Sequence, residues 1–521
     1  MHSRDYHLKK ARLNNTQQDW STYKRLRNTV TYSLKRSKAN YYRTLLNESC
    51  DQPKLFWKNI KKVFSTKSGN KETSSTMKIG DTITNDKSLI ANGFCNYFTN
   101  IAKSLLNKVT TVYNRTWKVY DNEHMVNNIN LKNSRFEFSN VSVSSIENQL
   151  KVIKTKKAAG PDNITATMIK DVSRELAYPL CFLINLSLQK GIFPSVEKVA
   201  KVTPIYKAEE KTLFDNYRPI SVLNIVSKVI EKVIYMQLIH YLETNKLLNQ
   251  HQFGFRPKKC TQDAVLFLSD FIRQNMDQGN LTGALYLDLR KAFDTVSHSC
   301  LINKLPYYGI NNKELCWISD YLFNRTQYVN YNQHTSSVNS LSYGVPQGSI
   351  LGPLLFVILI NDVPSSLVKC NILMYADDAV IFCSGSSTKM IQNTIVDDGE
   401  NIFRWFQQND LILNLKKSKT EFILYGTPQK LRNQEKCNII IKGTNIAQST
   451  KYEYLGVILD QHLTFNDQIN KIYKKASNRL HLLNRIRCNV NPYSALSIYH
   501  SMIEPIIMYC SPLYLGISNT A

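Results

Sequence analysis

The sequence predicts an α+β fold built from several subdomains, and three observations carry this prediction. Two apolar, strand-like runs end in acidic residues, one at Asp288 and one at the pair Asp377 and Asp378. In other segments apolar residues recur every three or four positions, which is the period of a helix face. A chain of 521 residues with 43% hydrophobic residues can also bury more than one core.

Charge and apolar spacing in the N-terminal region predict a basic, mostly helical extension with a linker over residues 1–132. Its first 67 residues hold 16 Lys or Arg but only 4 Asp or Glu. Ser, Thr, Asn and Gly gather over 65–76, which predicts a linker. Contact with a nucleic-acid backbone and a solvated helix face packed on the body both fit this extension. One apolar helix face is predicted from Trp20, Tyr23, Leu26, Val30 and Leu34.

Charge and composition narrow the class of partner. A net charge of +26 favours a polyanion, and nucleic acid is the obvious one, although acidic membranes and solubility also suit basic charge. No segment nears the roughly 18 apolar residues of a membrane span, and no secretory signal is visible, so we expect an intracellular protein. The 11 cysteines form no Cys-x-x-Cys pair, which argues against a disulfide framework and structural zinc.

Beyond the N-terminal extension, apolar spacing predicts further helices, and a strand-turn-strand surrounds Tyr375 to Asp378. The helix predicted over 465–487 is basic and amphipathic. The predicted helices cover residues 89–109, 141–154, 351–361, 394–408 and 465–487.

The acidic residues predict a site for divalent cations. Two adjacent carboxylates between buried strands repel each other and are costly to desolvate, so Asp377 and Asp378 favour bound cations. An ordinary solvated turn is the alternative for this pair alone. If the fold set the two strands side by side, Asp288 would join the pair. Three such carboxylates suit nucleotidyl transfer, which uses two Mg²⁺ ions about 3.5–4 Å apart; Mn²⁺ is a possible substitute.

Several blocks resemble the successive motifs of reverse transcriptases, in order, spacing and content. They are 288–296 (DLRKAFDTV), 344–353 (GVPQGSILGP) and 375–378 (YADD). Additional blocks are similar to those of non-LTR (LINE-type, Jockey-like) retrotransposon polymerases, so that the resemblance runs from about residue 136 to 515. These additional blocks are 157–162, 216–221, 252–256, 414–420 and 454–457.

The resemblance implies a right-hand polymerase behind the basic N-terminal extension. Residues 133–280 would form the fingers, 281–430 the palm, and 431–521 the primer grip and a truncated thumb. The implied activity is that of an RNA-directed DNA polymerase, which adds deoxynucleotides to a primer 3′ hydroxyl on an RNA template. Its partners would be the RNA template, a DNA primer or target DNA, and dNTPs. The implied ligands of two Mg²⁺ ions are Asp288, Asp377, Asp378 and the carbonyl of Leu289.

A triphosphate needs fixed cations and a forked donor, and the resemblance assigns this role to Arg218. Lys207 and Lys211 are alternatives for a second contact, and all three also fit ordinary surface charges. Phe293 would pack beneath the sugar and exclude a 2′ hydroxyl, although a core phenylalanine explains it equally.

The remaining assignments concern the base pair, the primer and the leaving group. Gln347 and Gly348 would line the nascent base pair, or form an exposed turn before a helix. The primer grip would be Tyr454, Leu455 and Gly456. Lys416, Lys417 and Lys419 are candidates for the acid that protonates pyrophosphate, or form a solvated basic turn.

Two rival functions stay open at this stage. Asp294 follows Asp288 at the spacing of the ribose-sensing pair of RNA-dependent RNA polymerases, which keeps that activity as an alternative. The sequence shows neither the endonuclease nor the Cys/His knuckle or RNase H segment expected around such a polymerase. We therefore expect a fragment or truncated copy, and a catalytically inert nucleic-acid-binding remnant is the other alternative. Template, target site and oligomeric state stay open.

Overall fold

The chain forms two compact units in the computed structural model. One unit combines Met1–Thr73 with Thr464–Ala521, and the other is Ser74–Leu463. Helices and sheets are mixed, as the predicted fold class requires. The residues that the structure describes are 1–49, 52–64, 76–112, 135–156, 158–415, 419–432, 434–487 and 490–514.

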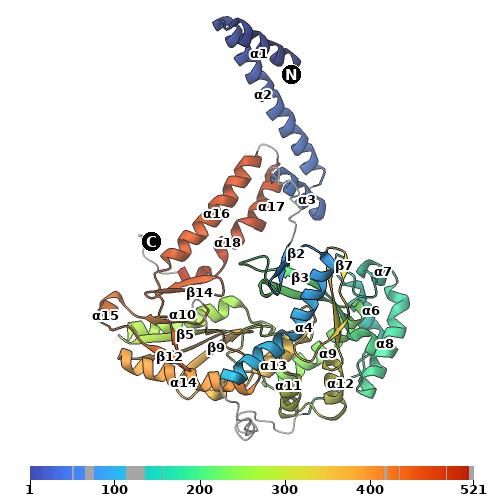
Figure 1. Ribbon diagram of the computed structural model, residues 1–521, viewed down its shortest axis with the longest axis vertical. Helices are drawn as coiled ribbons and strands as arrows, with labels where there is room; N and C mark the ends of the chain where they lie inside the picture. The colour runs from blue at the N-terminus through green and yellow to red at the C-terminus, as the bar shows by residue number, and fades with distance from the viewer. Residues whose placement is uncertain are drawn as a thin grey trace. The chain divides into compact units, whose positions relative to one another are not determined.

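The described part of the first unit is helical and brings the two ends of the chain into one core. In Figure 1, the short α1 folds back beside the long α2, both in blue. The apolar face predicted for α2 is only partly covered, since Trp20 and Tyr23 are half-buried and Leu34 is exposed. The helices of this unit are α1 (His2–Asn14), α2 (Gln17–Asn47), α3 (Pro53–Phe64), α16 (Asn466–Ile486), α17 (Pro492–Met502) and α18 (Glu504–Met508). Its core comprises Leu46, Phe56, Ile60, Ile486, Val490 and Ile498.

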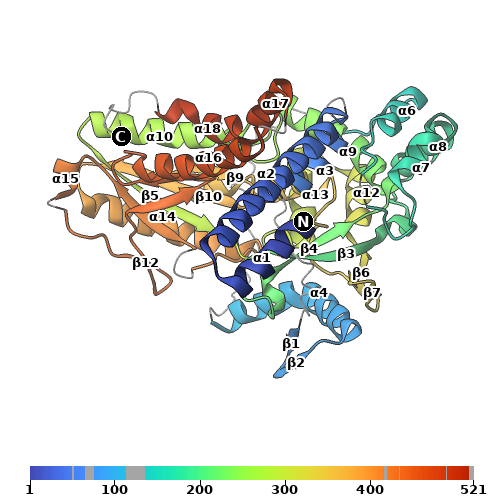
Figure 2. The same ribbon diagram turned by 90° about the horizontal axis from the view of Figure 1, so that it is seen from above.

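The second unit is organised around a four-stranded antiparallel sheet with the strand order β11-β5-β10-β9. Successive residues point to opposite faces of a strand. Phe382 meets Phe271 of α10 at 4.8 Å between ring centroids, whereas Gly283 faces Ile391 of α14. Figures 1 and 2 accordingly show α10 and α14 on opposite faces of this sheet. The elements are β5 (Leu281–Asp288), β9 (Asn371–Tyr375), β10 (Asp378–Gly385), β11 (Glu421–Tyr425), α10 (Thr261–Asp277) and α14 (Thr388–Gln408).

A second sheet has the strand order β4-β3-β6-β7, with β8 also paired to β6. The pairing of β3 with β4 is antiparallel, and that of β3 with β6 is parallel. α4 covers this sheet through an aromatic cluster centred on Phe94, which contacts Tyr217 and Phe214. The elements are β3 (Val199–Tyr206), β4 (Tyr217–Val222), β6 (Thr326–Tyr331), β7 (His334–Thr335), β8 (Asn339–Ser340) and α4 (Lys87–Val112).

Two apolar helices fill the main core of this unit. α13 (Gly352–Ile360) is buried almost all round, and α9 (Ile225–Thr244) buries half of its residues. The remaining helices are α6 (Val143–Lys151), α7 (Ala166–Asp171), α8 (Ser173–Lys190), α11 (His298–Lys304), α12 (Asn312–Leu322) and α15 (Pro428–Arg432). Short hairpins are β1 (Met77–Ile79) with β2 (Thr82–Thr84), β12 (Ile439–Ile441) with β13 (Thr444–Ile446), and β14 (Lys451–Tyr454) with β15 (Val457–Asp460).

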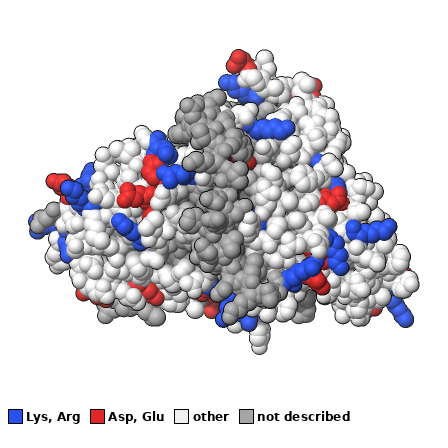
Figure 3. All heavy atoms as spheres, turned by 90° about the horizontal axis from the view of Figure 1, so that it is seen from below, with Lys and Arg blue, Asp and Glu red and all other residues white. Residues whose placement is uncertain are grey.

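The predicted helices are confirmed, four of them within about three residues at each end, whereas α14 begins six residues before the predicted start. They correspond to α4, α6, α13, α14 and α16, and the predicted strand-turn-strand is β9 and β10. The predicted linker over 65–76 lies almost wholly outside the described residues. None of the helices in the described ranges combines the length and apolar character that a membrane span needs. On the described part of the face in Figure 3, basic side chains lie dispersed, often beside acidic ones.

Candidate active site

Three acidic residues lie near one another where β5 and β10 run side by side. In the antiparallel register Asp378, the first residue of β10, is directly opposite Asp288, the last residue of β5. Asp378 is also the register partner of Tyr375 in β9, across the turn that carries Asp377. The strand adjacency on which the predicted acidic site depended is therefore present, despite the long stretch of sequence between the strands.

The turn between β9 and β10 has a restrained backbone. Ala376 has a φ of +57°, in the left-handed region that residues with a Cβ rarely adopt. It is buried, whereas Asp377 is half-buried and Asp378 is exposed. Such a conformation persists only where the surroundings impose it, and it is common at functional sites.

The pKa values of Asp377 and Asp378 are both raised at this site. Burial and the nearby Asp288 raise the pKa of Asp377, whereas Arg218 and Lys207 act in the opposite direction. Although the Asp378 side chain is exposed, desolvation of its carboxyl group by the surrounding protein, together with Asp377 and Asp288, raises its pKa to about 6. Burial is the largest cause of both shifts and neighbouring negative charge adds to it; a bound cation would relieve the charge repulsion.

The donor set fits a hard divalent cation, because carboxylate oxygens are the ligands that Mg²⁺ prefers. The buried Leu289, whose carbonyl was the fourth predicted ligand, continues the chain from Asp288 and pairs with Leu413 in an isolated bridge. Among the described residues, no group of three His, Cys, Asp or Glu side chains is already gathered closely enough to hold a metal ion.

Asn414 orients the Asp288 side chain, and sequence reasoning gave it no role of its own. Its Nδ2 donates to Oδ2 of Asp288 over 2.8 Å, and its backbone N–H donates to the carbonyl of Asp288, also over 2.8 Å. The only sequence signal was its place in the block 414–420. Within that block Lys419 is half-buried, while Lys416 and Lys417 lie outside the described residues.

The predicted triphosphate contacts lie on the β3–β4 hairpin. Arg218 is exposed on β4, opposite Ile205 in the register, and Lys207 follows the end of β3. Lys207 and Arg218 are near enough to the acidic cluster to lower the pKa of Asp377. Lys211 places its ammonium 5.4 Å from the ring centroid of Tyr206. The hairpin therefore brings Arg218 and Lys207 toward the aspartates, and Lys207 is the better placed of the two lysines.

Phe293 is half-buried in an aromatic cluster beside the acidic residues. Its ring lies 4.8 Å from that of Phe356 on α13 and 6.0 Å from that of Phe255, between centroids. Phe356 is fully buried, whereas Phe255 is 45% exposed. Phe293 thus lies between the core and the surface, a position that fits both interpretations of this residue.

Asp294 and Gln347 form a hydrogen-bonded pair. Nε2 of Gln347 donates to Oδ1 of Asp294 over 2.7 Å, and burial raises the pKa of Asp294 to about 6. The Asp294 carboxyl is therefore engaged by protein, which weakens the case for a ribose sensor. It instead fixes the orientation of the Gln347 amide.

The loop that follows Gln347 is held against β4 and α9. The carbonyl of Gln347 accepts from the N–H of Ser221, and Gly348 has a φ of +133°. A Cβ at Gly348 would lie 2.4 Å from the Ser221 carbonyl, so this close approach requires glycine. The fully buried Glu231 accepts from the N–H of Ile350 over 2.5 Å. Gly348 therefore has a packing role whether or not it also contacts a base pair.

The β14–β15 hairpin packs on the sheet beside the aspartates. The rings of Tyr452 and Tyr286 stack at 4.1 Å between centroids, and Tyr454 lies 5.5 Å from Tyr286. Asp378 and Asp288 contribute to the raised pKa of Tyr452, although burial is the main cause. Tyr452 was not predicted, although the alternation of tyrosines in Lys451–Tyr454 was a visible signal for one strand face.

The three residues predicted as the primer grip occupy the end of this hairpin. Tyr454 is buried at the end of β14. Leu455 and Gly456 form the turn, with φ of +47° and +89°. Positive φ at both central residues is the geometry of a tight two-residue hairpin.

Comparisons with known proteins agree with this geometry. Residues 205–459 match the family described as reverse transcriptase (RNA-dependent DNA polymerase). The probable RNA-directed DNA polymerase from transposon BS of Drosophila melanogaster is 27% identical over 387 residues, which cover 71% of this chain and 41% of the relative. The RNA-directed DNA polymerase from mobile element jockey of the same species is 26% identical and covers 72% of this chain and 42% of the relative.

A further relative gives the same result. The probable RNA-directed DNA polymerase from transposon X-element of Drosophila melanogaster is 27% identical, covering 67% of this chain and 38% of the relative. The chain thus spans about two fifths of the length of the curated relatives that it matches. Residues 205–459 thus match the reverse transcriptase family, and the chain is similar to RNA-directed DNA polymerases of transposon BS, mobile element jockey and transposon X-element.

Proposed function

We propose that this chain is an RNA-directed DNA polymerase that extends a DNA primer on an RNA template. The observation that carries the proposal is the register of β5 and β10, which places Asp288 opposite Asp378 and next to the turn with Asp377. Oxygen ligands beside the basic β3–β4 hairpin suit a magnesium-bound triphosphate. The matched reverse transcriptase domain supports the same reaction.

In this proposal Asp288 and Asp377 are the principal metal ligands, with Asp378 and the Leu289 carbonyl in support. Two Mg²⁺ ions, or Mn²⁺ in their place, would supply activation of the 3′ hydroxyl and charge neutralisation at the leaving group. Asn414 fixes the orientation of Asp288 through its hydrogen bond. Positioning and electrostatics, rather than covalent chemistry, are then what the protein contributes.

The proposed dNTP site lies between the β3–β4 hairpin and the loop around Gln347. Arg218 would bind the triphosphate, with Lys207 preferred over Lys211 as its partner. Phe293 would lie beneath the sugar. Gln347 and Gly348 would border the nascent base pair, and Tyr454, Leu455 and Gly456 would guide the primer end.

The proposed layout is that of a right hand. Residues 133–280 would act as fingers, 281–430 as palm and 431–521 as primer grip and thumb, with 1–132 as a basic extension. The net charge of +26 supports binding of RNA and DNA, which should weaken as salt rises. Such work on an element's RNA and its target DNA would take place in the cytoplasm and nucleus.

Primer extension tests the proposal directly. Purified protein would be given an RNA template, a DNA primer, Mg²⁺ and dNTPs, next to the double variant Asp377→Ala/Asp378→Ala. We expect extension by the unmodified chain alone, with RNA binding equal in both proteins. A parallel reaction with ribonucleotides addresses the RNA polymerase alternative.

Each of the other outcomes would contradict one part of the proposal. Tight template binding without extension in either protein would favour the inert nucleic-acid-binding remnant. Preferential incorporation of ribonucleotides would favour an RNA-dependent RNA polymerase. Extension by the double variant would refute the assignment of the metal ligands.

A further inference from the structure

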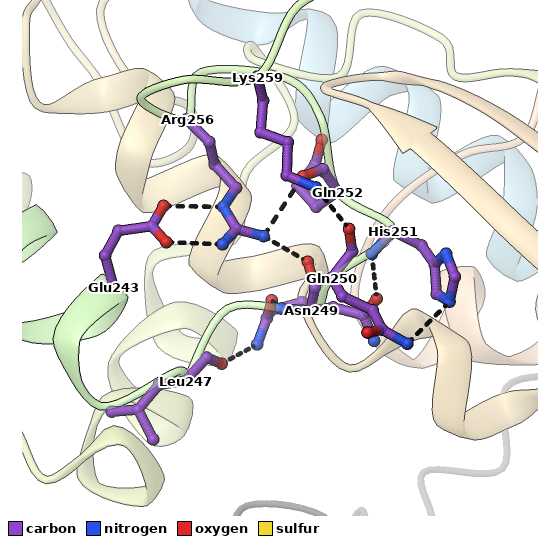
Figure 4. A network of polar contacts seen from close by, with 9 residues as sticks. Glu243, Leu247, Asn249, Gln250, His251, Gln252, Arg256 and Lys259 are labelled. Atoms are coloured by element: carbon purple, nitrogen blue, oxygen red, sulfur yellow. Dashed lines mark hydrogen bonds and ion pairs between the residues drawn. The ribbon is translucent and has the colours of Figure 1, made fainter. Parts of the chain in front are cut away.

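The loop that joins α9 to α10, residues 245–260, is anchored at one side by a partly buried ion pair. Arg256 donates from Nε to Glu243 of α9 over 2.8 Å, and from its second terminal nitrogen over 2.6 Å. Its other terminal nitrogen donates to the carbonyl of Asn249 over 2.6 Å. Figure 4 shows this fork of contacts, through which Arg256 links Asn249 in the same loop to Glu243 near the end of α9. The Arg256 side chain is only 9% exposed.

The opposite side of the same loop pairs with the edge of β9. The N–H of Phe253 donates to the carbonyl of Met374 over 2.8 Å, and the N–H of Met374 donates to the carbonyl of His251 over 2.9 Å. Gln252 and Met374 form a parallel bridge at this point. The loop therefore extends the central sheet by a short strand-like contact, two residues before the turn at Ala376.

The Gln252 side chain reaches that turn from the loop. It is fully buried, and its Oε1 accepts from the N–H of Gly254 over 2.8 Å and from the N–H of Ala376 over 3.1 Å. Gly254 lies so close to the turn that a Cβ there would be 2.3 Å from the Ala376 nitrogen. The loop and the turn are thus held together by the Gln252 hydrogen bond and by the close packing of Gly254.

We propose that Gln252 is a positioning residue, whose amide oxygen holds Ala376 in its left-handed conformation and thereby fixes the direction of Asp377. The inference rests on the proposed polymerase function. A buried N–H without an acceptor is unfavourable, so the turn is destabilised when this oxygen is removed. Asp377 is the next residue along the chain, and any rotation at Ala376 moves its carboxylate.

The two polar atoms of the Gln252 amide differ in what they do. Nε2 is buried and has no hydrogen-bond partner among the described residues. The role therefore belongs to the oxygen, which a glutamate side chain keeps and an isosteric methionine lacks. If Gln252 merely filled space, Gln252→Met would be more active than Gln252→Glu, because methionine suits a buried site better than a carboxylate does.

The test compares Gln252→Met and Gln252→Glu with the unmodified full chain. The matched control is Gln250→Met, because Gln250 is exposed on the same loop. In primer extension at saturating dNTP, we expect Gln252→Met to lower kcat by about 10–100-fold, as displacements near 1 Å do. RNA affinity should stay within about threefold, because this substitution leaves the charge of the chain unchanged. Gln252→Glu should retain more activity than Gln252→Met.

Calorimetric titration with Mn²⁺ gives a readout that does not need turnover. We expect Gln252→Met to weaken Mn²⁺ binding by about 10-fold, the effect typical of losing a group that orients a metal ligand. If Gln252→Met does not fold, Gly254→Ala takes its place, because its Cβ would push on the same turn.

Each outcome decides the inference. An unchanged Mn²⁺ affinity of Gln252→Met would overturn the inference. Higher activity of Gln252→Met than of Gln252→Glu would overturn it as well. Failure of the unmodified chain to extend primers would refute the proposed function alone, since the Mn²⁺ affinities still decide the role of Gln252.

Discussion

Some acidic residues at this site lower the stability of the folded protein, because their charged form is buried. Asp294 illustrates the cost, since its pKa lies near 6 rather than at the ordinary 3.8. Burial disfavours the ionised form, while the hydrogen bond from Gln347 favours it and only partly compensates. Asp294 is thus kept where a neutral residue would be more stable, and its value to the protein is the orientation of the Gln347 amide.

The sign of this pKa shift predicts how stability depends on pH. Between about pH 4 and 6 the folded state holds a proton on Asp294 that the unfolded state has released, so the free energy of unfolding falls as pH rises through this window. Asp294→Asn cannot ionise and still accepts from Gln347. We expect this variant to have a higher Tm than the unmodified protein at pH 8, with no difference near pH 4. Calorimetry at both pH values measures the effect.

The control for this measurement is Asp397→Asn, because Asp397 is exposed on α14. A Tm difference for Asp294→Asn that is the same at both pH values would contradict the assignment. Asp294→Ala adds a functional comparison. It frees the Gln347 amide, so it should reduce dNTP incorporation more than Asp294→Asn does.

At the scale of elements, α9 holds two loops of the candidate site. Glu231 in its middle binds the N–H of Ile350 after the Gln347 loop, and Glu243 at its end binds Arg256 of the α9–α10 loop. Both carboxylates belong to a helix that packs in the core, so both loops are held in place by a rigid element. The acidic turn is similarly flanked, by the α9–α10 loop at β9 and by β5 at β10.

The β14–β15 hairpin gives a prediction at this scale. Tyr452→Ala removes the ring stacked on Tyr286 and should lower primer extension about 3–10-fold, because such aromatic pairs contribute roughly 0.5–1.5 kcal/mol. Tyr452→Phe keeps the ring and should retain most activity. Extension rates from a matched primer, with primer affinity measured separately, test this. Glu453→Ala is the control, since Glu453 is exposed and alternates to the opposite strand face. Equal losses in Tyr452→Ala and Glu453→Ala would contradict the role.

Local patterns explain why most elements were predictable and several contacts were not. The helical period is visible within about 11–18 neighbouring residues, so α14 and α16 followed from local spacing, whereas α13 followed from a short, wholly apolar run. The register of Asp288 with Asp378 joins distant segments, and strand pairing leaves no mark within either strand alone. Gln252 and Asn414 were visible as members of motif blocks, but their roles depend on backbone groups far along the chain.

At the scale of the whole molecule, the two ends of the chain share one hydrophobic core. Phe56 and Ile60 of α3 lie in the same cluster as Ile486 of α16 and Ile498 of α17. The N-terminal helices and the last helices were predicted as separate regions, and composition alone gives no reason to join them. Their common core implies that the C-terminal helices depend on the N-terminal ones for stability.

This dependence predicts a long-range effect of Phe56→Ala. Phe56 is 5% exposed, so its truncation should cost about 3–5 kcal/mol within this unit. Hydrogen exchange read by mass spectrometry should then speed up in α16 and α17, although they lie at the other end of the sequence. Tyr41→Ala is the control, because Tyr41 on α2 is 62% exposed. Unchanged exchange in α16 and α17 would show that these helices do not depend on the N-terminal core.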